Sequence, residues 1–203
     1  MTWYVVRAGG MVALVLLTAS VVLGITLSGR ARLHRWPRFA LEDVHAFAGT
    51  LAGIFIALHG AALLVDHYLP FSLTNLLVPG TAPYRPLATA LGVVGAELLA
   101  ALALTNRYRR RLPYEIWRRL HYLNFAVWTL ALVHGIAAGT DSDTAWGAAV
   151  YAACGGSVFG AVAWRTLRAH VTPWAARLSL ATGTVVGAEL VLALMLGPFA
   201  HHG

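Results

Sequence analysis

The sequence predicts an all-α membrane protein, a bundle of six transmembrane helices that forms a single domain over residues 1–203. Composition is the first observation behind this fold class. Hydrophobic residues make up 59% of the chain and charged residues 11%, with a mean hydropathy of +0.68, whereas about a quarter of the residues in soluble domains are charged. The second observation is that the apolar residues gather in six stretches, each long enough to cross about 30 Å of hydrocarbon as a helix.

The six predicted spans follow one another with short connections, so we expect no soluble module within this sequence. They cover residues 5–27, 44–65, 87–105, 120–138, 145–164 and 178–196. We interpret the first span as a helix and not as a cleaved signal peptide, because its cluster of positive charge follows the apolar run instead of preceding it.

The positions of the arginines predict how the helices are oriented. All fifteen basic residues are Arg, and thirteen lie in or beside the first, third and fifth connections. By the positive-inside rule these connections are cytoplasmic, which predicts a multi-pass protein of the plasma membrane with both termini on the outer face. The net charge of +7 then reflects topology, and we expect membrane lipid, not nucleic acid, as the partner of these side chains.

Two of the predicted spans each contain a pair of histidines. His45 and His59 are fourteen residues apart, and His121 and His134 are thirteen apart. Both spans begin at the predicted cytoplasmic face, so they run parallel, and their histidines form an inner and an outer layer separated by about 20 Å. Because polar groups at this depth are costly, their presence favours a function.

Ligation of two stacked haems by paired histidines is the chemistry that needs this arrangement, since neutral imidazole binds iron on each face of the porphyrin. The expected cofactors are two b-type haems, because Cys154 is the single cysteine and the C-x-x-C-H motif is absent. On an ideal helix two residues thirteen positions apart point in directions that differ by about 140° around the axis. The second pair therefore requires tilt, local irregularity or an approach from different sides. The rival interpretation is a transporter or scaffold whose histidines bind protons or metal ions.

The segments VHAFAGTLAGIFIALHG and LHYLNFAVWTLALVHG, joined by YRPLATALG and NRYRRRLPYEIWRRLHYLNF, resemble the ferric-reductase-like transmembrane domain. This is the haem-bearing core shared with NADPH oxidases and eukaryotic ferric reductases, and the similarity covers about residues 10–170. The resemblance implies that His45 with His121 ligate the inner haem, that His59 with His134 ligate the outer haem, and that electrons pass across the membrane between them.

NADPH oxidases continue into a cytoplasmic flavin and nicotinamide domain, which we do not expect in this sequence. The expected enzyme is therefore a haem-dependent transmembrane oxidoreductase that receives electrons from a separate flavoprotein reductase or from a membrane quinol. Its acceptor on the outer face is left open between a small molecule, such as Fe(III) or oxygen, and a periplasmic protein. The last alternative follows from similar haem membrane subunits that serve periplasmic methionine sulfoxide reductases.

Several arginines are candidate contacts of the anionic haem propionates. Arg118, Arg119 and one arginine of residues 30–38 are candidates at the inner haem, and the alternative is that they only anchor the topology. Arg85 could pair with an outer propionate or attract an anionic oxidant. The apolar connection at residues 66–86 is expected to cover the outer haem or to pack on the membrane surface.

Two carboxyl groups and one further histidine have open roles. Glu97 and Glu189 lie within predicted spans beside small residues, which suits either close helix packing or a proton relay. His67 lies just beyond the second span, where it could cover the outer haem, bind a metal ion or simply face solvent.

Overall fold

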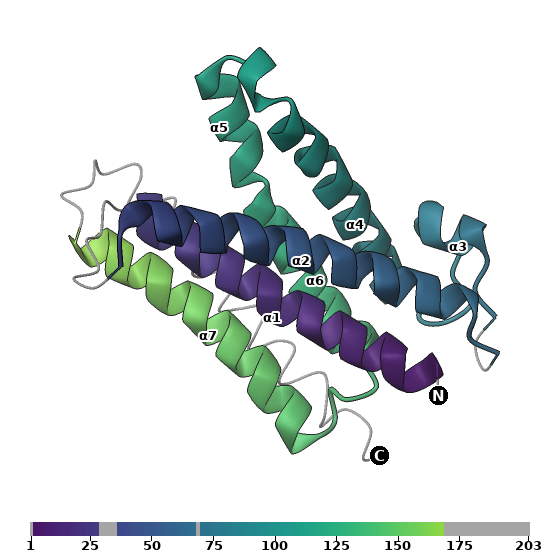
Figure 1. The fold of residues 1–203 in the computed structure, drawn as a ribbon. Coiled ribbons are helices and arrows are strands. Elements are labelled where there is room, and N and C mark those ends of the chain that lie inside the picture. Colours follow the sequence, from purple (N-terminus) through teal and green to yellow (C-terminus); the bar gives the residue numbers. More distant parts are fainter. Residues whose placement is uncertain (1, 29–35, 68–69, 169–203) are drawn as a thin grey trace. The chain divides into compact units, whose positions relative to one another are not determined.

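A computed structural model describes residues 2–28, 36–67 and 70–168, and the regular secondary structure in these ranges is helical (Figure 1). The helices in chain order are α1 (Thr2–Ser28), α2 (Arg38–Leu64), α3 (Leu73–Leu77), α4 (Pro86–Arg107), the 3-10 turn η1 (Arg109–Arg111), α5 (Tyr114–Tyr122), α6 (Asn124–Ala138) and α7 (Ala145–Arg168). Five of the spans are long and apolar enough to cross a membrane, with α5 and α6 together forming one of them. The all-α membrane fold is therefore confirmed, while the predicted span 178–196 lies outside the described residues.

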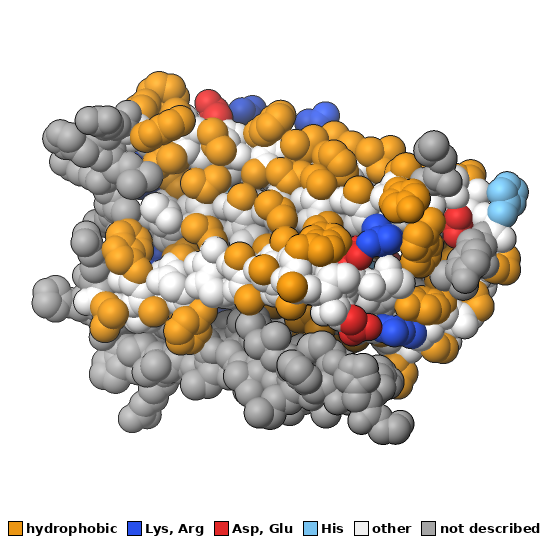
Figure 2. Space-filling view, turned by 90° about the horizontal axis from the view of Figure 1, so that it is seen from below, with side chains coloured by type: hydrophobic (Ala, Val, Ile, Leu, Met, Phe, Trp, Pro, Cys, Tyr) orange, Lys and Arg blue, Asp and Glu red, His pale blue; other side chains and the backbone are white. Residues whose placement is uncertain are grey.

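Large apolar side chains are exposed along the spans, as a lipid solvent requires. On α2 the exposed fractions are 65% for Phe47, 51% for Ile54 and 51% for Leu58. Figure 2 shows hydrophobic side chains over much of the described surface in that view, with few charged ones. Exposed apolar surface of this extent would be unfavourable in water, so the chain is a multi-pass membrane protein.

The chain divides into two compact units, which are described separately below. The first unit comprises Met1–Leu14 with Ala52–Gly139, and the second comprises Val15–Leu51 with Thr140–Gly203. In the first unit α4 packs along α6, and α5 and α3 also contact α4. The buried hydrophobic side chains of these two helices are Val93 and Leu102 on α4 and Val127, Trp128 and Leu132 on α6.

The span that carries His121 and His134 is broken between them. Helix α5 ends at Tyr122 and α6 begins at Asn124, because the N–H of Leu123 donates to the carbonyl of Leu120 at 3.0 Å in a tightened turn. The Asn124 side chain also donates to the carbonyl of His121 at 2.7 Å. The thirteen-residue spacing was predicted to require tilt, local irregularity or an approach from different sides, and the structure contains a local irregularity of the helix.

The connection between α2 and α4 is a folded segment containing α3. Ser72 and Asn75 form a capping box at its N-terminus, and the Asn75 amide donates to the carbonyl of Thr81 at 2.7 Å. Leu76 lies beside the end of α2, since its Cδ1 is 3.8 Å from where a Cβ on Gly60 would be. The segment therefore packs next to the part of α2 that carries His59.

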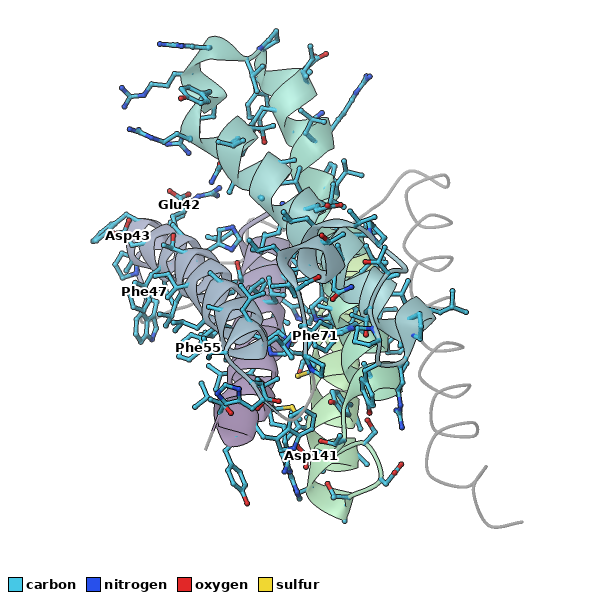
Figure 3. The ribbon with its side chains drawn as sticks, turned by 90° about the vertical axis from the view of Figure 1, so that its right-hand side faces the viewer. Glu42, Asp43, Phe47, Phe55, Phe71 and Asp141 are labelled. Atoms are coloured by element: carbon cyan, nitrogen blue, oxygen red, sulfur yellow. The ribbon has the colours of Figure 1, made fainter. Side chains whose placement is uncertain are left out.

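In the second unit α1 contacts α7 near the end of α1. Arg165 on α7 donates to the carbonyl of Ile25 at 3.4 Å and to the hydroxyl of Ser28. These acceptors lie in the last turn of α1, where carbonyls lack helical N–H partners. At the start of α2, Glu42 is exposed, lies beside Asp43 and pairs with Arg38 at 2.9 Å (Figure 3).

Candidate functional site

His59 is held by a main-chain carbonyl of the neighbouring helix. Its Nδ1 donates to the carbonyl oxygen of Val6 on α1 at 2.8 Å. A carbonyl oxygen can only accept, so this bond places the imidazole proton on Nδ1. In the neutral ring Nε2 is then unprotonated, with a lone pair available for a metal ion.

His134 repeats this arrangement on another pair of helices. Its Nδ1 donates to the carbonyl oxygen of Ala88 on α4, also at 2.8 Å. The same reasoning leaves its Nε2 unprotonated. Both imidazoles are therefore oriented by a main-chain hydrogen bond, as is common for a histidine that binds a metal.

The two imidazoles lie close together within the first unit. The ring centres of His59 and His134 are 6.4 Å apart, and the ring planes meet at 79°. Two imidazoles that bind one metal ion from opposite sides have ring centres about 6 Å apart, because each metal–nitrogen bond is about 2.0 Å and each nitrogen lies about 1.1 Å from its ring centre. The separation therefore fits a haem iron bound between them.

Each of these histidines also sits against a glycine of the helix that supplies the carbonyl. A Cβ on Gly10 would lie 3.2 Å from Cε1 and Nδ1 of His59, and a Cβ on Gly92 would lie 2.8 Å from the same atoms of His134. In both cases the glycine follows the accepting residue by four positions. In an α-helix the N–H at that position bonds the same carbonyl, so a missing side chain leaves the second lone pair of the oxygen open to the imidazole.

His45 shows the same combination within the second unit. Its Nδ1 donates to the carbonyl oxygen of Ser20 at 2.8 Å, and a Cβ on Gly24 would lie 3.3 Å from its Cε1. The Ser20 hydroxyl lies 3.2 Å from the same nitrogen and donates to the carbonyl of His45 at 3.3 Å. We call the carbonyl and the glycine four residues later a glycine cradle; the three cradles are Val6–Gly10, Ser20–Gly24 and Ala88–Gly92.

His121 has contacts of a different kind within its own span. The indole of Trp117 stacks on its imidazole with ring centres 5.1 Å apart and planes at 25°. The Asn124 side-chain nitrogen is 3.4 Å from its Nδ1. His121 belongs to the first unit and its predicted partner His45 to the second, so each is described within its own unit.

The arginine predicted to face an outer ligand has a main-chain partner in the structure. Arg85 precedes α4 in a left-handed conformation with φ of 40°, and its guanidinium donates to the carbonyl of Ala137 at 2.6 Å. That carbonyl is in the last turn of α6, three residues after His134. Arg118 and Arg119 are exposed, and the guanidinium of Arg118 lies over a tyrosine ring of α5.

The remaining predicted residues are not gathered at the histidines. Glu97 is exposed in the middle of α4, and His67 is exposed beyond the end of α2, whereas Glu189 lies outside the described residues. Asp66 is buried and accepts a hydrogen bond from Thr2 at 2.6 Å. Across residues 2–28, 36–67 and 70–168 no group of three or more His, Cys, Asp or Glu side chains could hold a metal ion.

Fold and site together define a multi-pass helical membrane protein in which two histidines from different helices lie close together, each with its Nδ1 bonded to a main-chain carbonyl. Residues 9–133 match the family described as the ferric reductase like transmembrane component. The chain belongs to this family, as its sequence motifs predicted. The matched segment contains three of the four histidines and ends one residue before His134.

Membership in the family indicates transmembrane electron transfer and an oxidoreductase type of function. Proteins of the family generally bind haem, which agrees with the distance between the two imidazoles. Neither the comparison with curated proteins nor the comparison with solved structures gave a match.

Sequence reasoning did not find the glycine cradles, although a signal was present. Gly10 and Gly24 are fourteen residues apart, the same spacing as His45 and His59 on α2. Because α1 and α2 are antiparallel neighbours, each of these glycines meets one histidine. The stacking of Trp117 on His121 was also missed, although a separation of four residues places two side chains on one face of a helix.

Proposed function

We propose that this protein transfers electrons across the membrane through two b-type haems, each ligated by two histidines. His59 and His134 would hold the outer haem, and His45 and His121 the inner one. The observation that carries the proposal is the pairing of His59 with His134, whose ring centres are 6.4 Å apart. A haem bound in this way supplies a six-coordinate iron that changes its charge by one electron while keeping its ligands.

The residues around His59 and His134 support this role because they restrict what each imidazole can do. A ring whose Nδ1–H is bonded to a carbonyl presents Nε2 in one direction and becomes a better electron donor to the metal. The adjoining glycines bring α1 and α4 close to the rings, which limits the entry of water. Such restraint suits electron transfer, since ligands that do not move add little to the reorganisation energy.

The two ends of the electron path complete the proposal. A separate flavoprotein reductase or a membrane quinol would supply electrons at the cytoplasmic face. The acceptor would be a small molecule or a periplasmic protein at the outer face. Comparing the initial rate of haem reduction with an added quinol and with a reduced flavoprotein identifies the donor.

The direct test is the reduced-minus-oxidised absorption spectrum of the full-length protein in detergent, with haem counted per chain. We expect two low-spin b haems, and we expect His59→Ala to remove one of them. His67→Ala is the matched control, because it removes an exposed histidine only eight residues further along the chain. Unchanged haem content in the His59 variant would refute the ligand assignment, and a colourless wild-type protein would favour the transporter interpretation.

Electron paramagnetic resonance provides an independent test of the pair. Ligand planes at 79° are nearly perpendicular. Perpendicular imidazoles give low-spin ferric haem a more strongly anisotropic signal than parallel ones. We therefore expect a strongly anisotropic signal that disappears in both His59→Ala and His134→Ala, and a signal of the parallel type would contradict the geometry of this site.

A further inference from the structure

Two side-chain hydrogen bonds join α4 and α6 near His134, and they run in opposite directions. His134 on α6 donates from Nδ1 to the carbonyl of Ala88 on α4 at 2.8 Å. Arg85, the residue before α4, donates from its guanidinium to the carbonyl of Ala137 on α6 at 2.6 Å. At each helix the donor precedes the acceptor by three residues, which is about one turn. We call these two bonds the reciprocal clamp, because each helix supplies one donor and one acceptor.

The guanidinium of Arg85 caps the C-terminal end of α6. That helix ends at Ala138, so the carbonyl of Ala137 lies in the last turn, where carbonyls lack the regular helical N–H partner. A guanidinium suits this place, because its positive charge also interacts favourably with the negative end of the helix dipole. The capped residue is about 4.5 Å along the helix axis from His134. Arg85 therefore restrains the part of α6 that carries the imidazole.

Arg85 also adopts a backbone conformation that residues other than glycine rarely take. Its φ of 40° and ψ of 65° lie in the left-handed region, and in the part of the chain that the structure describes it is the one non-glycine residue with a positive φ. The turn is fixed by Thr89, whose hydroxyl donates to the carbonyl of Tyr84 at 2.7 Å and whose N–H donates to the carbonyl of Arg85 at 2.9 Å. The Tyr84 ring centre lies 5.3 Å from the guanidinium carbon. Strained backbone of this kind persists where the surrounding contacts fix it, and it clusters at functional sites.

We propose that Arg85 is a positioning residue for His134. This inference rests on the proposed function, since it takes His134 as a ligand of the outer haem. By holding the end of α6 against α4, the guanidinium fixes the separation across which the imidazole reaches the Ala88 carbonyl. It therefore fixes the plane of the His134 ring, which meets that of His59 at 79°. The ferric signal of the outer haem then depends on the reciprocal clamp.

The test replaces Arg85 in the full-length protein in detergent and compares the ferric electron paramagnetic resonance signal with the melting temperature. Arg85→Gly and Arg85→Asn remove the guanidinium bond, and both residue types tolerate a positive φ, so the turn before α4 is kept. Two variants are made so that one can be measured if the other does not fold. Arg110→Ala is the matched control, because it removes an exposed arginine just beyond the opposite end of α4. A parallel His134→Ala variant identifies the signal of the outer haem.

In both Arg85 variants we expect the signal that His134→Ala abolishes to broaden and to lose its strong anisotropy, while the signal of the other haem is unchanged. Arg85→Gly separates positioning from stability, because relief of the backbone strain should keep its melting temperature close to that of the wild type. A wild-type signal in Arg85→Gly and Arg85→Asn would overturn the positioning role, and so would an equal change in Arg110→Ala, which would attribute the effect to lost charge. Retention of both haems in His134→Ala would instead refute the ligand assignment, and the inference with it.

Discussion

Replacing Gly92 by alanine should weaken the binding of the haem that we propose His134 to ligate. The added Cβ would lie 2.8 Å from Cε1 and Nδ1 of the imidazole and 2.9 Å from its Cγ. Nonbonded carbon atoms approach to about 3.5 Å, so the ring must withdraw by about 0.7 Å. This movement would lengthen the hydrogen bond to the Ala88 carbonyl from 2.8 Å to about 3.5 Å, beyond the usual limit of about 3.2 Å for such a bond.

The free energy that Gly92→Ala costs in haem binding can be estimated in two ways. Overpacking a well-filled interior costs about 1–3 kcal/mol. Loss of the hydrogen bond that orients a metal-binding histidine lowers metal affinity by about ten- to hundredfold, which is about 1.4–2.8 kcal/mol. The two figures agree, so the variant should hold one haem firmly and the other with an affinity reduced by one to two orders of magnitude.

The assay counts haem per chain during titration of the purified protein with haem, with electron paramagnetic resonance to identify the haem that remains. Gly53→Ala is the control, because no heavy atom lies within 4 Å of its added Cβ. Alanine is also the better helix former, so a weaker α4 cannot explain a loss. Two fully occupied haems with unchanged signals in Gly92→Ala would refute the argument that this glycine makes room for the ligand.

Two further substitutions give graded outcomes. In Gly10→Ala the Cβ would lie 3.2 Å from the His59 ring, which requires a shift of only a few tenths of an ångström, so we expect retained haem with an altered potential, measured by redox titration. A loss of haem as large as in Gly92→Ala would contradict this relation between the distance from Cβ to the ring and the effect on haem binding. Arg85→Ala should lower the free energy of unfolding in detergent by about 1 kcal/mol, because the hydrogen bond to the Ala137 carbonyl is lost while residue 85 keeps its left-handed conformation. Arg85→Gly should recover about 1 kcal/mol of this, since glycine adopts φ of 40° without strain, and the opposite order of melting temperatures would disprove the account.

The bilayer makes the fold of this protein more predictable than its site. A chain must satisfy its backbone hydrogen bonds within each span, so apolar length alone identifies helices. The predicted spans 5–27, 87–105 and 145–164 correspond to α1, α4 and α7, each shorter than the helix by a few residues at one or both ends. These helices extend past the hydrocarbon stretch because arginines and other polar residues continue them into the interface.

The site depends on which helix lies beside which, and this is harder to infer. The histidine spacing predicts that His59 and His134 share a layer, and the structure brings these two rings together. The carbonyl that each imidazole bonds belongs to Val6 or Ala88, whose side chains carry no sign of that role. The position of Arg85 in an outer connection predicts a role at an outer propionate or an anionic oxidant but not its hydrogen bond to a main-chain carbonyl of α6.

The glycine cradles have a consequence for how this protein tolerates mutation. Each acceptor is a main-chain carbonyl, so at positions 6 and 88 the identity of the side chain does not supply the bond. Substitutions at these two positions that keep the helix intact should leave the bond that orients the histidine in place. The glycine four residues later has no such freedom, since a single methyl group there meets the ring. Mutations that damage these sites should therefore concentrate at the three glycines, which lie on α1 and α4, helices that carry none of the four histidines.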